Sequence, residues 1–565
     1  MQTLLEPSTP RIAYFSMEVA LASYLPTYSG GLGVLAGDML RAAADLRLPM
    51  VGVSLIHRKG YLDQDLDAAG NQTERPAPWT PDTWTTELPA RVSMRLEDRE
   101  VWLRAFRYDV KGAHGYTIPV LLLDTDLPEN SPEDRSLTDV LYGGDARYRL
   151  MQEAVLGIGG VRMLRALGYG QLERFHMNEG HAALLALELV DESARQAGRT
   201  SIDAVDIERA RKLCVFTTHT PVSSGHDQFP IELAERVLGR PEIKHMSEIF
   251  CCDGVLNMTF LALNLSHYVN GVAKRHQEVS QQMFARYPID SITNGIHAAT
   301  WATPAFQALF DRWIPGWRED NLSLRYALKI SRRDVQAAHL EAKRALFDRV
   351  RHDSGKVMNE EVFTMGFGRR ATPYKRAGLL LKDPERLRRL SRELGPMQII
   401  YAGKAHPRDE AGKELIREVV AALASLGPDI SGTYLEDYDM DLAKLMVSGV
   451  DLWLNTPEPP LEASGTSGMK AAINGVPSLS VLDGWWLEGH VEGVTGWAIG
   501  KPRSGPDGVR DAEDLYEQLE RVILPLFYER SDDYVDVMRH AIALTGSFFN
   551  THRMLQQYLT RAYFL

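Results

Sequence analysis

The chain alternates short apolar runs with longer stretches of helical periodicity over most of its length. Short buried strands that alternate with helices are typical of α/β architecture with parallel sheets. The sequence therefore predicts an α/β fold, and 565 residues are enough for two or more units of this kind. We expect strands at 11–15, 50–55, 213–217, 362–367, 397–402 and 450–455, and helices at 37–46, 153–167 and 415–426.

The stretch from about 301 to 357 has helical periodicity and no strand pattern, and the turn-like segment 293–295 precedes it. We therefore expect two Rossmann-like domains, residues 1–297 and 298–544, with a deep cleft between them. The aromatic-rich tail at about 545–565 is expected to pack back on the first domain. Ligands of such sheets bind at loops outside the carboxyl ends of the strands, and the motifs below fall at loops of this kind.

Charge and cysteine content exclude several classes of function. The formal net charge is −12, from 63 basic and 75 acidic residues, which argues against nucleic acid or an anionic membrane as a partner. The three cysteines, Cys214, Cys251 and Cys252, form no CxxC motif, so we expect neither a disulfide framework nor a metal site. No apolar run of about 18 residues and no signal peptide are found, so a cytoplasmic protein is expected.

The strongest local pattern is LNTPEPPLEASGTSGMK, which ends at Lys470. Its glycines allow backbone N–H groups to approach an anion, and the hydroxyls of Ser464, Thr466 and Ser467 add donors ahead of a helix expected at 471–475. A lysine at this point is a candidate ion partner or Schiff-base amine. The alternative from chemistry alone is a glycine-rich turn with a solvated lysine.

This segment resembles the pyridoxal-phosphate lysine motif of the α-glucan phosphorylases. Five further segments resemble motifs of that family in the same order: YSGGLG at 28–33, HMNEGH at 176–181, FTTHT at 216–220, TNGI at 293–296 and RRATPYKR at 369–376. The resemblance implies the GT-B fold and the reversible phosphorolysis of α-1,4-glucans (glycogen, starch or maltodextrin) to glucose 1-phosphate, with retention.

The resemblance also implies pyridoxal 5′-phosphate, held as a Schiff base on Lys470, whose phosphate exchanges a proton with the substrate phosphate. Arg370 and Lys375 would contact the substrate phosphate, and Lys375 would also lie near the cofactor phosphate. The family usually has lysine where this chain has Arg369. The cofactor contacts implied are Arg369, Thr466, Ser467, Gly468 and Tyr438.

His219 would contact the sugar 6-hydroxyl and, through its carbonyl, stabilise an oxocarbenium-like centre, so the implied catalytic residues are His219, Arg370 and Lys375. The implied substrate contacts are Gly30, Gly31, Leu32, Asn294, Glu462, Ser464, Gly465, His181 and Asp145. Glu179 stands where the family usually has aspartate. Trp485 and Trp486 could stack on sugar rings, but a place in the core is the preferred interpretation.

Three other functions are weighed against this one. A GT-B glycosyltransferase that uses a nucleotide sugar, such as a glycogen synthase-like enzyme, would not need Lys470 as an amine. A non-catalytic glucan-binding protein would not need an intact Lys470 and basic loop, and no motif singles out the carboxylate pair of a glycoside hydrolase.

The chain resembles a compact member of the family. It reaches the glycine segment by Gly30, so we expect neither an AMP site nor a regulatory phosphoserine. The preferred glucan length, the physiological direction, effectors and a homo-oligomer stay open, and residues 223–278 match the family least well.

Overall fold

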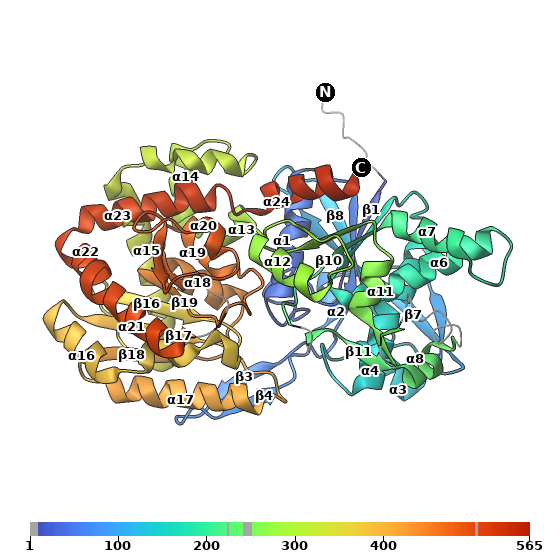
Figure 1. The fold of residues 1–565 in the computed structure, drawn as a ribbon, viewed down its shortest axis with the longest axis horizontal. Coiled ribbons are helices and arrows are strands. Elements are labelled where there is room, and N and C mark those ends of the chain that lie inside the picture. Colours follow the sequence, from blue (N-terminus) through green and yellow to red (C-terminus); the bar gives the residue numbers. More distant parts are fainter. Residues whose placement is uncertain are drawn as a thin grey trace.

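The computed structural model describes residues 9–222, 225–240, 251–252, 254–502, 505 and 507–564, with backbone only at 251–252. Two α/β halves lie side by side (Figure 1): an N-terminal half in blue to green and a C-terminal half in yellow to red. Each half is built around one large sheet. The expected α/β class is confirmed.

The sheet of the N-terminal half is parallel through its centre. Its strand order is β15 (Asp290–Ser291), β14 (Tyr268–Gly271), β10 (Cys214–Thr217), β9 (Arg174–Asn178), β1 (Ile12–Ser16), β2 (Met50–Leu55), β8 (Thr117–Asp124), β7 (Arg99–Lys111) and β5 (Thr86–Glu87). The strands from β15 to β8 pair in parallel, whereas β7 is antiparallel to β8, and β5 and β6 (Val92–Leu96) are antiparallel to β7. The carboxyl ends of these seven neighbouring strands therefore share one edge.

The sheet of the C-terminal half is parallel throughout. Its order is β18 (Ile430–Leu435), β17 (Met397–Ala402), β16 (Phe363–Gly368), β19 (Leu452–Asn455), β20 (Ser478–Val481) and β21 (Gly496–Ile499). Every residue of β16, β17 and β19 is buried. Strands that are covered on both faces read as continuous apolar runs, which explains why the sequence marked them so clearly.

All six expected strands are present within two residues of their predicted starts and ends, but the three expected helices begin five to seven residues earlier than predicted. Helix α1 (Gly31–Asp45) begins six residues before the expected start, within the YSGGLG segment. A Cβ on Gly37 would lie 2.1 Å from the carbonyl oxygen of Ala20, so close packing, and not a turn, requires that glycine. The expected helix at 153–167 is the end of a longer one: α4 (Ala146–Ala154), η2 (Val155–Gly159) and α5 (Gly160–Ala166).

The helical stretch between the sheets is confirmed as α13 (Ala298–Trp301), α14 (Pro304–Trp313), η5 (Asn321–Lys329) and α15 (Arg332–Ser354), and the expected helix at 415–426 lies within α17 (Glu410–Leu426). The other elements of the N-terminal half are α2 (Pro81–Trp84), α3 (Pro132–Arg135), η1 (Ser136–Thr138), η3 (Gly180–Ala182), α6 (Leu184–Gln196), α7 (Ala204–Leu213), α8 (Ile231–Leu238), α11 (Met258–Asn264), α12 (Lys274–Met283) and the small strands β11 (Gln228–Pro230), β12 (Cys251–Cys252) and β13 (Val255–Asn257). Those of the C-terminal half are η6 (Pro373–Lys375), η7 (Ala377–Leu381), α16 (Pro384–Glu393), α18 (Met440–Gly449), α19 (Ser467–Ile473), α20 (Trp486–Gly489), α21 (Gly508–Gln518), η8 (Leu519–Ile523), α22 (Leu524–Glu529), α23 (Ser531–His540) and η9 (Ala541–Gly546).

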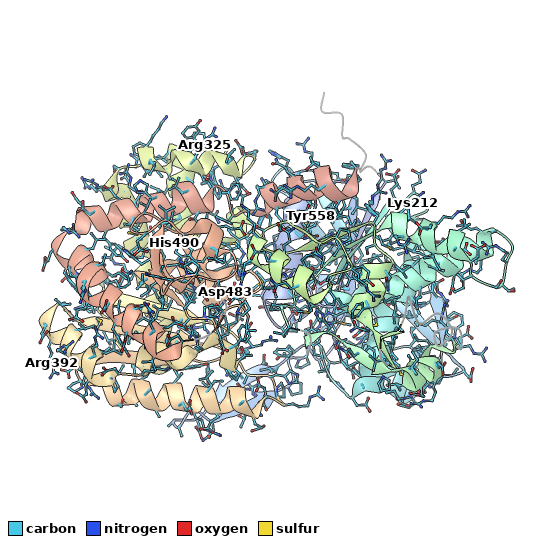
Figure 2. The ribbon with its side chains drawn as sticks, in the orientation of Figure 1. Lys212, Arg325, Arg392, Asp483, His490 and Tyr558 are labelled. Atoms are coloured by element: carbon cyan, nitrogen blue, oxygen red, sulfur yellow. The ribbon has the colours of Figure 1, made fainter. Side chains whose placement is uncertain are left out.

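The last helices, α24 (Thr551–Tyr558) and η10 (Leu559–Tyr563), return to the N-terminal half, as Figures 1 and 2 show. The Tyr558 hydroxyl lies 2.9 Å from Thr217 Oγ1 and accepts a hydrogen bond from Asn270 Nδ2 at 3.1 Å. The Tyr563 hydroxyl lies 2.6 Å from His176 Nδ1. Buried polar partners thus fix the end of the chain to β9, β10 and β14.

A hairpin of the N-terminal half, β3 (Asp63–Leu66) and β4 (Gln72–Arg75), contacts the C-terminal half. Gln64 Nε2 donates to the Gly403 carbonyl at 3.0 Å, and Gln72 Nε2 donates to the Ala405 carbonyl at 2.9 Å. These bonds place the hairpin at the carboxyl end of β17. No helix in the described part of the chain is both long and apolar enough to cross a membrane.

Candidate active site

The lysine segment connects β19 to α19 in the C-terminal half. Helix α19 begins at Ser467, where the sequence predicted a helix only from 471, and Lys470 N–H already donates to the Thr466 carbonyl at 3.1 Å. The expectation of a lysine ahead of the helix was therefore wrong. Met469 and Lys470 are good helix formers, and as part of the helix both are buried.

Small residues in this segment allow close packing. Gly465 has φ +75°, and a Cβ there would lie 3.3 Å from Glu462 Oε1. A Cβ on Gly468 would lie 2.9 Å from the Trp485 ring, so glycine is required at both positions. Trp485 and its neighbour Trp486 are 2% and 1% exposed, which confirms that both belong to the core.

The three predicted hydroxyl donors have different surroundings. Ser464 is buried, and its hydroxyl donates to the Gly465 carbonyl at 3.3 Å. Ser467 Oγ accepts from the Trp453 indole N–H at 3.1 Å. Thr466 is the N-cap residue of α19, and its side chain makes no capping bond. Thr466 and Ser467 are each only partly buried, so they are the ones that can still meet a ligand.

The Lys470 amine is buried in an apolar setting. Its Nζ lies 3.9 Å from the centre of the Trp301 ring and has no hydrogen-bond partner within the described ranges. Burial lowers the pKa of this amine to about 8, although the carboxylate of Asp38 acts in the opposite direction. An amine that is partly neutral near pH 7 is a competent nucleophile toward a carbonyl group. No motif predicted Trp301 or Asp38 at this position.

Asp38 and Trp301 are themselves held together. Asp38 Oδ2 accepts hydrogen bonds from Trp301 Nε1 at 2.7 Å and from the His297 amide at 3.2 Å. Asp38 belongs to α1, and Trp301 ends the short helix that follows the TNGI segment. Residues from α1, α13 and α19 therefore meet at the lysine.

A second buried cluster joins the basic loop to the lysine segment. Lys375 Nζ and Arg369 Nη1 lie 2.6 and 2.9 Å from Glu462 Oε2. Burial alone would raise the pKa of Glu462, but the charges of Arg369 and Lys375 outweigh it and lower that pKa to about 2. The cluster is ionised at neutral pH and carries a net charge of +1.

Asp483 and Tyr438 support this cluster. Asp483, labelled in Figure 2, accepts the Glu462 amide at 2.9 Å, and burial raises the pKa of Asp483 to about 6. The Tyr438 ring packs against the end of β16, where a Cβ on Gly368 would lie 3.0 Å from it. Burial raises the pKa of Tyr438, and the charge of Arg369 opposes this rise, which places the phenol near the cluster.

Arg370 is exposed and has no ion-pair partner in the part of the chain that the structure describes. Tyr61 belongs to the N-terminal half, and burial raises its pKa to about 12. The charge of Arg370 acts against this rise, which places Arg370 near Tyr61. Arg370 thus presents an unpaired cation close to the opposite half. A free cation beside a paired one suits the binding of an anion.

The glycine segment begins α1, with Gly30 as the N-cap and Gly31 and Leu32 in the first turn. Glu18, which follows β1, accepts hydrogen bonds from the amides of Ser29 at 2.7 Å and Gly30 at 3.1 Å. A Cβ on either Gly30 or Gly31 would have open space around it, so these two glycines leave room beside the backbone. Glu18 is a buried carboxylate that the sequence analysis missed, although its place directly after a strand could have pointed to it.

His219 follows β10 and is held on both sides. Its Nε2 lies 2.7 Å from Asn178 Oδ1, and its amide donates to Glu179 Oε2 at 2.7 Å. The Asn178 amide group donates to Ser16 Oγ, so the shared hydrogen is on His219 Nε2. Burial lowers the pKa of His219 to about 4, against the effect of Glu179, and the imidazole is neutral at pH 7.

Glu179 is the strained residue of this group, with φ +76°. Its carboxylate also accepts from the Gly180 amide at 3.0 Å and from the Thr220 hydroxyl at 3.0 Å. The sequence singled out Glu179 only as a departure from the family pattern. The structure shows that this side chain fixes the backbone of His219.

Glu179→Ala is expected to lower the free energy of unfolding by about 2–4 kcal/mol, because it leaves the His219 amide without its acceptor and keeps the strained φ. Glu179→Gly loses the same bonds but relieves the strain, so it should be about 1 kcal/mol more stable than the alanine variant. Thermal unfolding of both variants measures the order. An alanine variant as stable as the glycine variant would contradict the strain argument.

The remaining predicted residues lie apart from the two clusters. Asn294 is buried, its Oδ1 has no partner among the described residues, and its carbonyl accepts from Arg553 Nη2 at 2.9 Å. His181 Nε2 lies 3.2 Å from Asp227 Oδ2. Asp145 is exposed and caps α4 by accepting the Tyr148 amide at 2.9 Å. The structure therefore gives Asp145 a capping role and shows no contact with the clusters.

Comparison with known proteins identifies relatives along nearly the whole chain. A family model for carbohydrate phosphorylases matches residues 239–492. The chain is 38% identical to a maltodextrin phosphorylase of Thermococcus litoralis and 37% identical to a glycogen phosphorylase of Mycobacterium tuberculosis. Each match covers 98% of this chain and 70% of the relative.

A relative of similar length is also found. An uncharacterized protein of Methanocaldococcus jannaschii is 32% identical over 98% of this chain and 99% of its own length. The compact length is thus shared with at least one other protein. The matched ranges include the lysine segment, the basic loop and the TNGI segment.

Proposed function

Because this chain belongs to the carbohydrate phosphorylase family, we propose that it catalyses the reversible phosphorolysis of α-1,4-glucans to glucose 1-phosphate, with retention. The observation that carries the proposal is the buried Lys470 amine, which has a lowered pKa and no hydrogen-bond partner among the described residues. It lies in the same short segment as Glu462, the centre of the basic cluster. Glycogen, starch and maltodextrin are the candidate glucans.

The proposed architecture is the GT-B type, with Rossmann-like domains at residues 1–297 and 298–544 and the tail from about 545 on the first domain. Two large sheets with parallel centres support it. Site residues follow the carboxyl ends of strands in both sheets: Asn178 ends β9, His219 follows β10, and Arg369 follows β16. Such edges are where α/β sheets bind ligands. An active site in a cleft between the domains follows from this arrangement.

Lys470 and its surroundings fit pyridoxal 5′-phosphate. The amine is available, the Trp301 ring and Tyr438 offer flat apolar surfaces, and Thr466 and Ser467 can donate hydrogen bonds from the start of α19. Arg369 and Lys375 would face the phosphate end. When bound, the cofactor supplies a phosphate group that exchanges a proton with the substrate phosphate.

The chain's own residues then account for phosphate binding. Two phosphates that lie close together repel each other, and three cations, Arg369, Arg370 and Lys375, stand within seven positions. Glu462 neutralises only one of them. Arg370 and Lys375 would bind and orient the substrate phosphate through charge-assisted hydrogen bonds.

His219 and Asn294 would hold the sugar. A neutral His219 whose Nε2–H is used by Asn178 leaves Nδ1 as an acceptor for a sugar hydroxyl. Glu179 fixes the backbone at His219 and so the direction of its carbonyl. The buried Asn294 Oδ1 is available to accept from a hydroxyl. Gly30, Gly31, Leu32, Glu462, Ser464, Gly465 and His181 complete the proposed substrate contacts, and Asp145 is the weakest of them because it caps α4.

The test is borohydride reduction of the purified protein followed by peptide mass mapping. A pyridoxyl adduct on Lys470, together with release of glucose 1-phosphate from a glucan and inorganic phosphate, is the expected result. A protein that carries nothing on Lys470 and transfers glucose from a nucleotide sugar would replace phosphorolysis by the GT-B glycosyltransferase alternative.

A further inference from the structure

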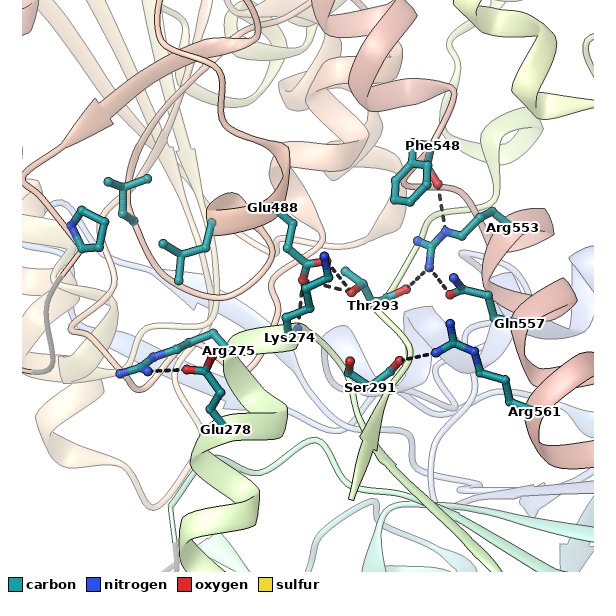
Figure 3. A pocket seen from close by; sticks show the side chains of 13 residues that line it. Lys274, Arg275, Glu278, Ser291, Thr293, Glu488, Phe548, Arg553, Gln557 and Arg561 are labelled. Carbon is teal, nitrogen blue, oxygen red and sulfur yellow. Dashed lines mark hydrogen bonds and ion pairs between the residues drawn. The ribbon is translucent and has the colours of Figure 1, made fainter. Parts of the chain in front are cut away.

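A large cavity lies beside the TNGI segment, whose Thr293 helps to line it (Figure 3). Its volume is about 980 Å³, at the upper end of the range of small-molecule sites. It is bordered by α12 of the N-terminal half, by the region around α20 of the C-terminal half and by the returning helix α24. Nothing in the proposed reaction uses it.

The residues that line this cavity carry a net positive charge, whereas the chain as a whole is negatively charged. Four cationic side chains line it, Lys274, Arg275, Arg553 and Arg561, against the two carboxylates Glu278 and Glu488. The difference is +2, in a protein whose net charge is −12. Like charges gathered in one concave place favour an anionic ligand.

The cations come from two helices with basic faces. Arg553, Gln557 and Arg561 are spaced by four residues and therefore share one face of α24 and η10. Lys274 and Arg275 begin α12, where acidic residues are normally favoured. Figure 3 shows these two faces on either side of the segment that carries Ser291 and Thr293.

Carboxylates do not neutralise these cations fully, although Asp290, outside the lining, lies 3.5 Å from Arg561 Nη1. Glu278 pairs with Arg275 at 2.6 Å. Glu488 accepts the Lys274 amide at 3.0 Å and the Thr293 hydroxyl at 2.9 Å, so it caps α12 and shows that an anion is stable at this point. The Lys274 side chain has no ion-pair partner in the described ranges.

Arg553 is the most unusual of the four. Its guanidinium donates only to neutral oxygens: the carbonyls of Phe548, Thr293 and Asn294 and the side chain of Gln557, at 2.5–3.0 Å. Burial lowers the pKa of Arg553 to about 10, so the charge is held at a cost that a bound anion would reduce. The same guanidinium fixes the carbonyl of Asn294, a proposed sugar contact.

We propose that this cavity binds a phosphomonoester, with the phosphate between Lys274, Arg553 and Arg561 and the body of the ligand toward Phe548. Three cations and a helix N-terminus match the charge and the oxygens of a phosphate. Phe548 is 44% exposed and offers an apolar surface to the rest of the ligand. A sugar phosphate and a nucleotide share this chemistry. The expectation of no AMP site concerned the segment before Gly30 and not this cavity. The proposal does not depend on the catalytic assignment.

Isothermal titration of the purified protein with ribose 5-phosphate and with adenosine 5′-monophosphate tests it. We expect binding of at least one probe that weakens tenfold or more in the double variant Lys274→Gln/Arg561→Gln and falls with added salt. Arg521→Gln, the same change at a residue 74% exposed and outside the cavity, should leave binding unchanged. A preference for the nucleotide that Phe548→Ala removes would assign the ring contact.

The variant Arg370→Gln distinguishes binding in this cavity from binding at the proposed catalytic phosphate site. It should leave binding of the probes to the cavity intact. The proposal is overturned if neither probe binds at 10 mM, or if Arg370→Gln abolishes binding while the double variant does not. A parent protein that binds a probe but does not phosphorolyse glucans would count against the catalytic assignment alone.

Discussion

Lys470→Ala is expected to carry no covalent cofactor and to lose phosphorolysis by on the order of 10⁴-fold, the scale seen when a group central to an active site is removed. With a pKa of about 8, roughly a tenth of the Lys470 amines are neutral at pH 7, against well under a thousandth for an ordinary lysine. The buried lysines Lys343 and Lys375 are each paired with a carboxylate, whereas Lys470 has no hydrogen-bond partner among the described residues. Absorbance of the bound cofactor and the initial rate of glucose 1-phosphate formation are the two measurements.

The matched control is Lys444→Ala, which removes a lysine that pairs with Asp441 on α18. It should retain cofactor and activity. A Lys470→Ala protein that still phosphorolyses glucans at a rate within tenfold of the parent, without added cofactor, would contradict the role assigned to this amine.

Lys375→Gln is expected to lower kcat/KM for phosphate by about 10²–10³-fold, the usual effect of removing one preorganised donor from a charged transition state. The Lys375 amine lies 2.6 Å from Glu462 Oε2, and the variant leaves Arg369 as the only buried cation of the cluster. Charge alone is not sufficient in this geometry, so Lys375→Arg should recover only part of the activity. Initial rates over a range of phosphate concentrations give the effect.

Binding of the cofactor to Lys375→Gln shows whether this variant has lost its fold or only its catalytic function. Lys375→Gln should still bind it on Lys470, because Lys375 makes no contact with that lysine in the structure. An unchanged dependence on phosphate in Lys375→Gln would remove this residue from the site. Lys444→Gln serves as the control for the charge change.

The strands were predictable because strands of parallel sheets are buried on both faces. Such strands need continuous apolar runs, such as Met397–Ala402, which can be recognised in the sequence. Helix starts were less predictable. At the helix starts Gly31 and Ser467 the chain has glycine or small residues that suit a turn equally well. Within these helices, Gly37 packs closely against Ala20 and Gly468 against Trp485, contacts that no local pattern predicts.

The motifs predicted Lys470, Arg369, Lys375 and Glu462, but not the residues that tune them. Trp301 is 169 positions from Lys470, and Asp38 is 432 positions away, so no local pattern connects them. Glu179 appears in a motif, yet its function depends on a backbone angle and on the amide of His219. Such residues act through contacts between positions that are far apart in the sequence. The spacing of residues along the chain does not show which of them come into contact.

The sequence by itself determined the α/β class, the order of the motifs and the chemical types gathered at the site, because each depends on local patterns of burial and charge. The tertiary structure decided which charges are paired, how far the pKa of Lys470 falls and where Asn294 is held. It also placed α24 beside α12, which creates the basic cavity from residues about 280 positions apart. These properties follow from burial and from distances of a few ångströms, and both exist only once the chain has folded.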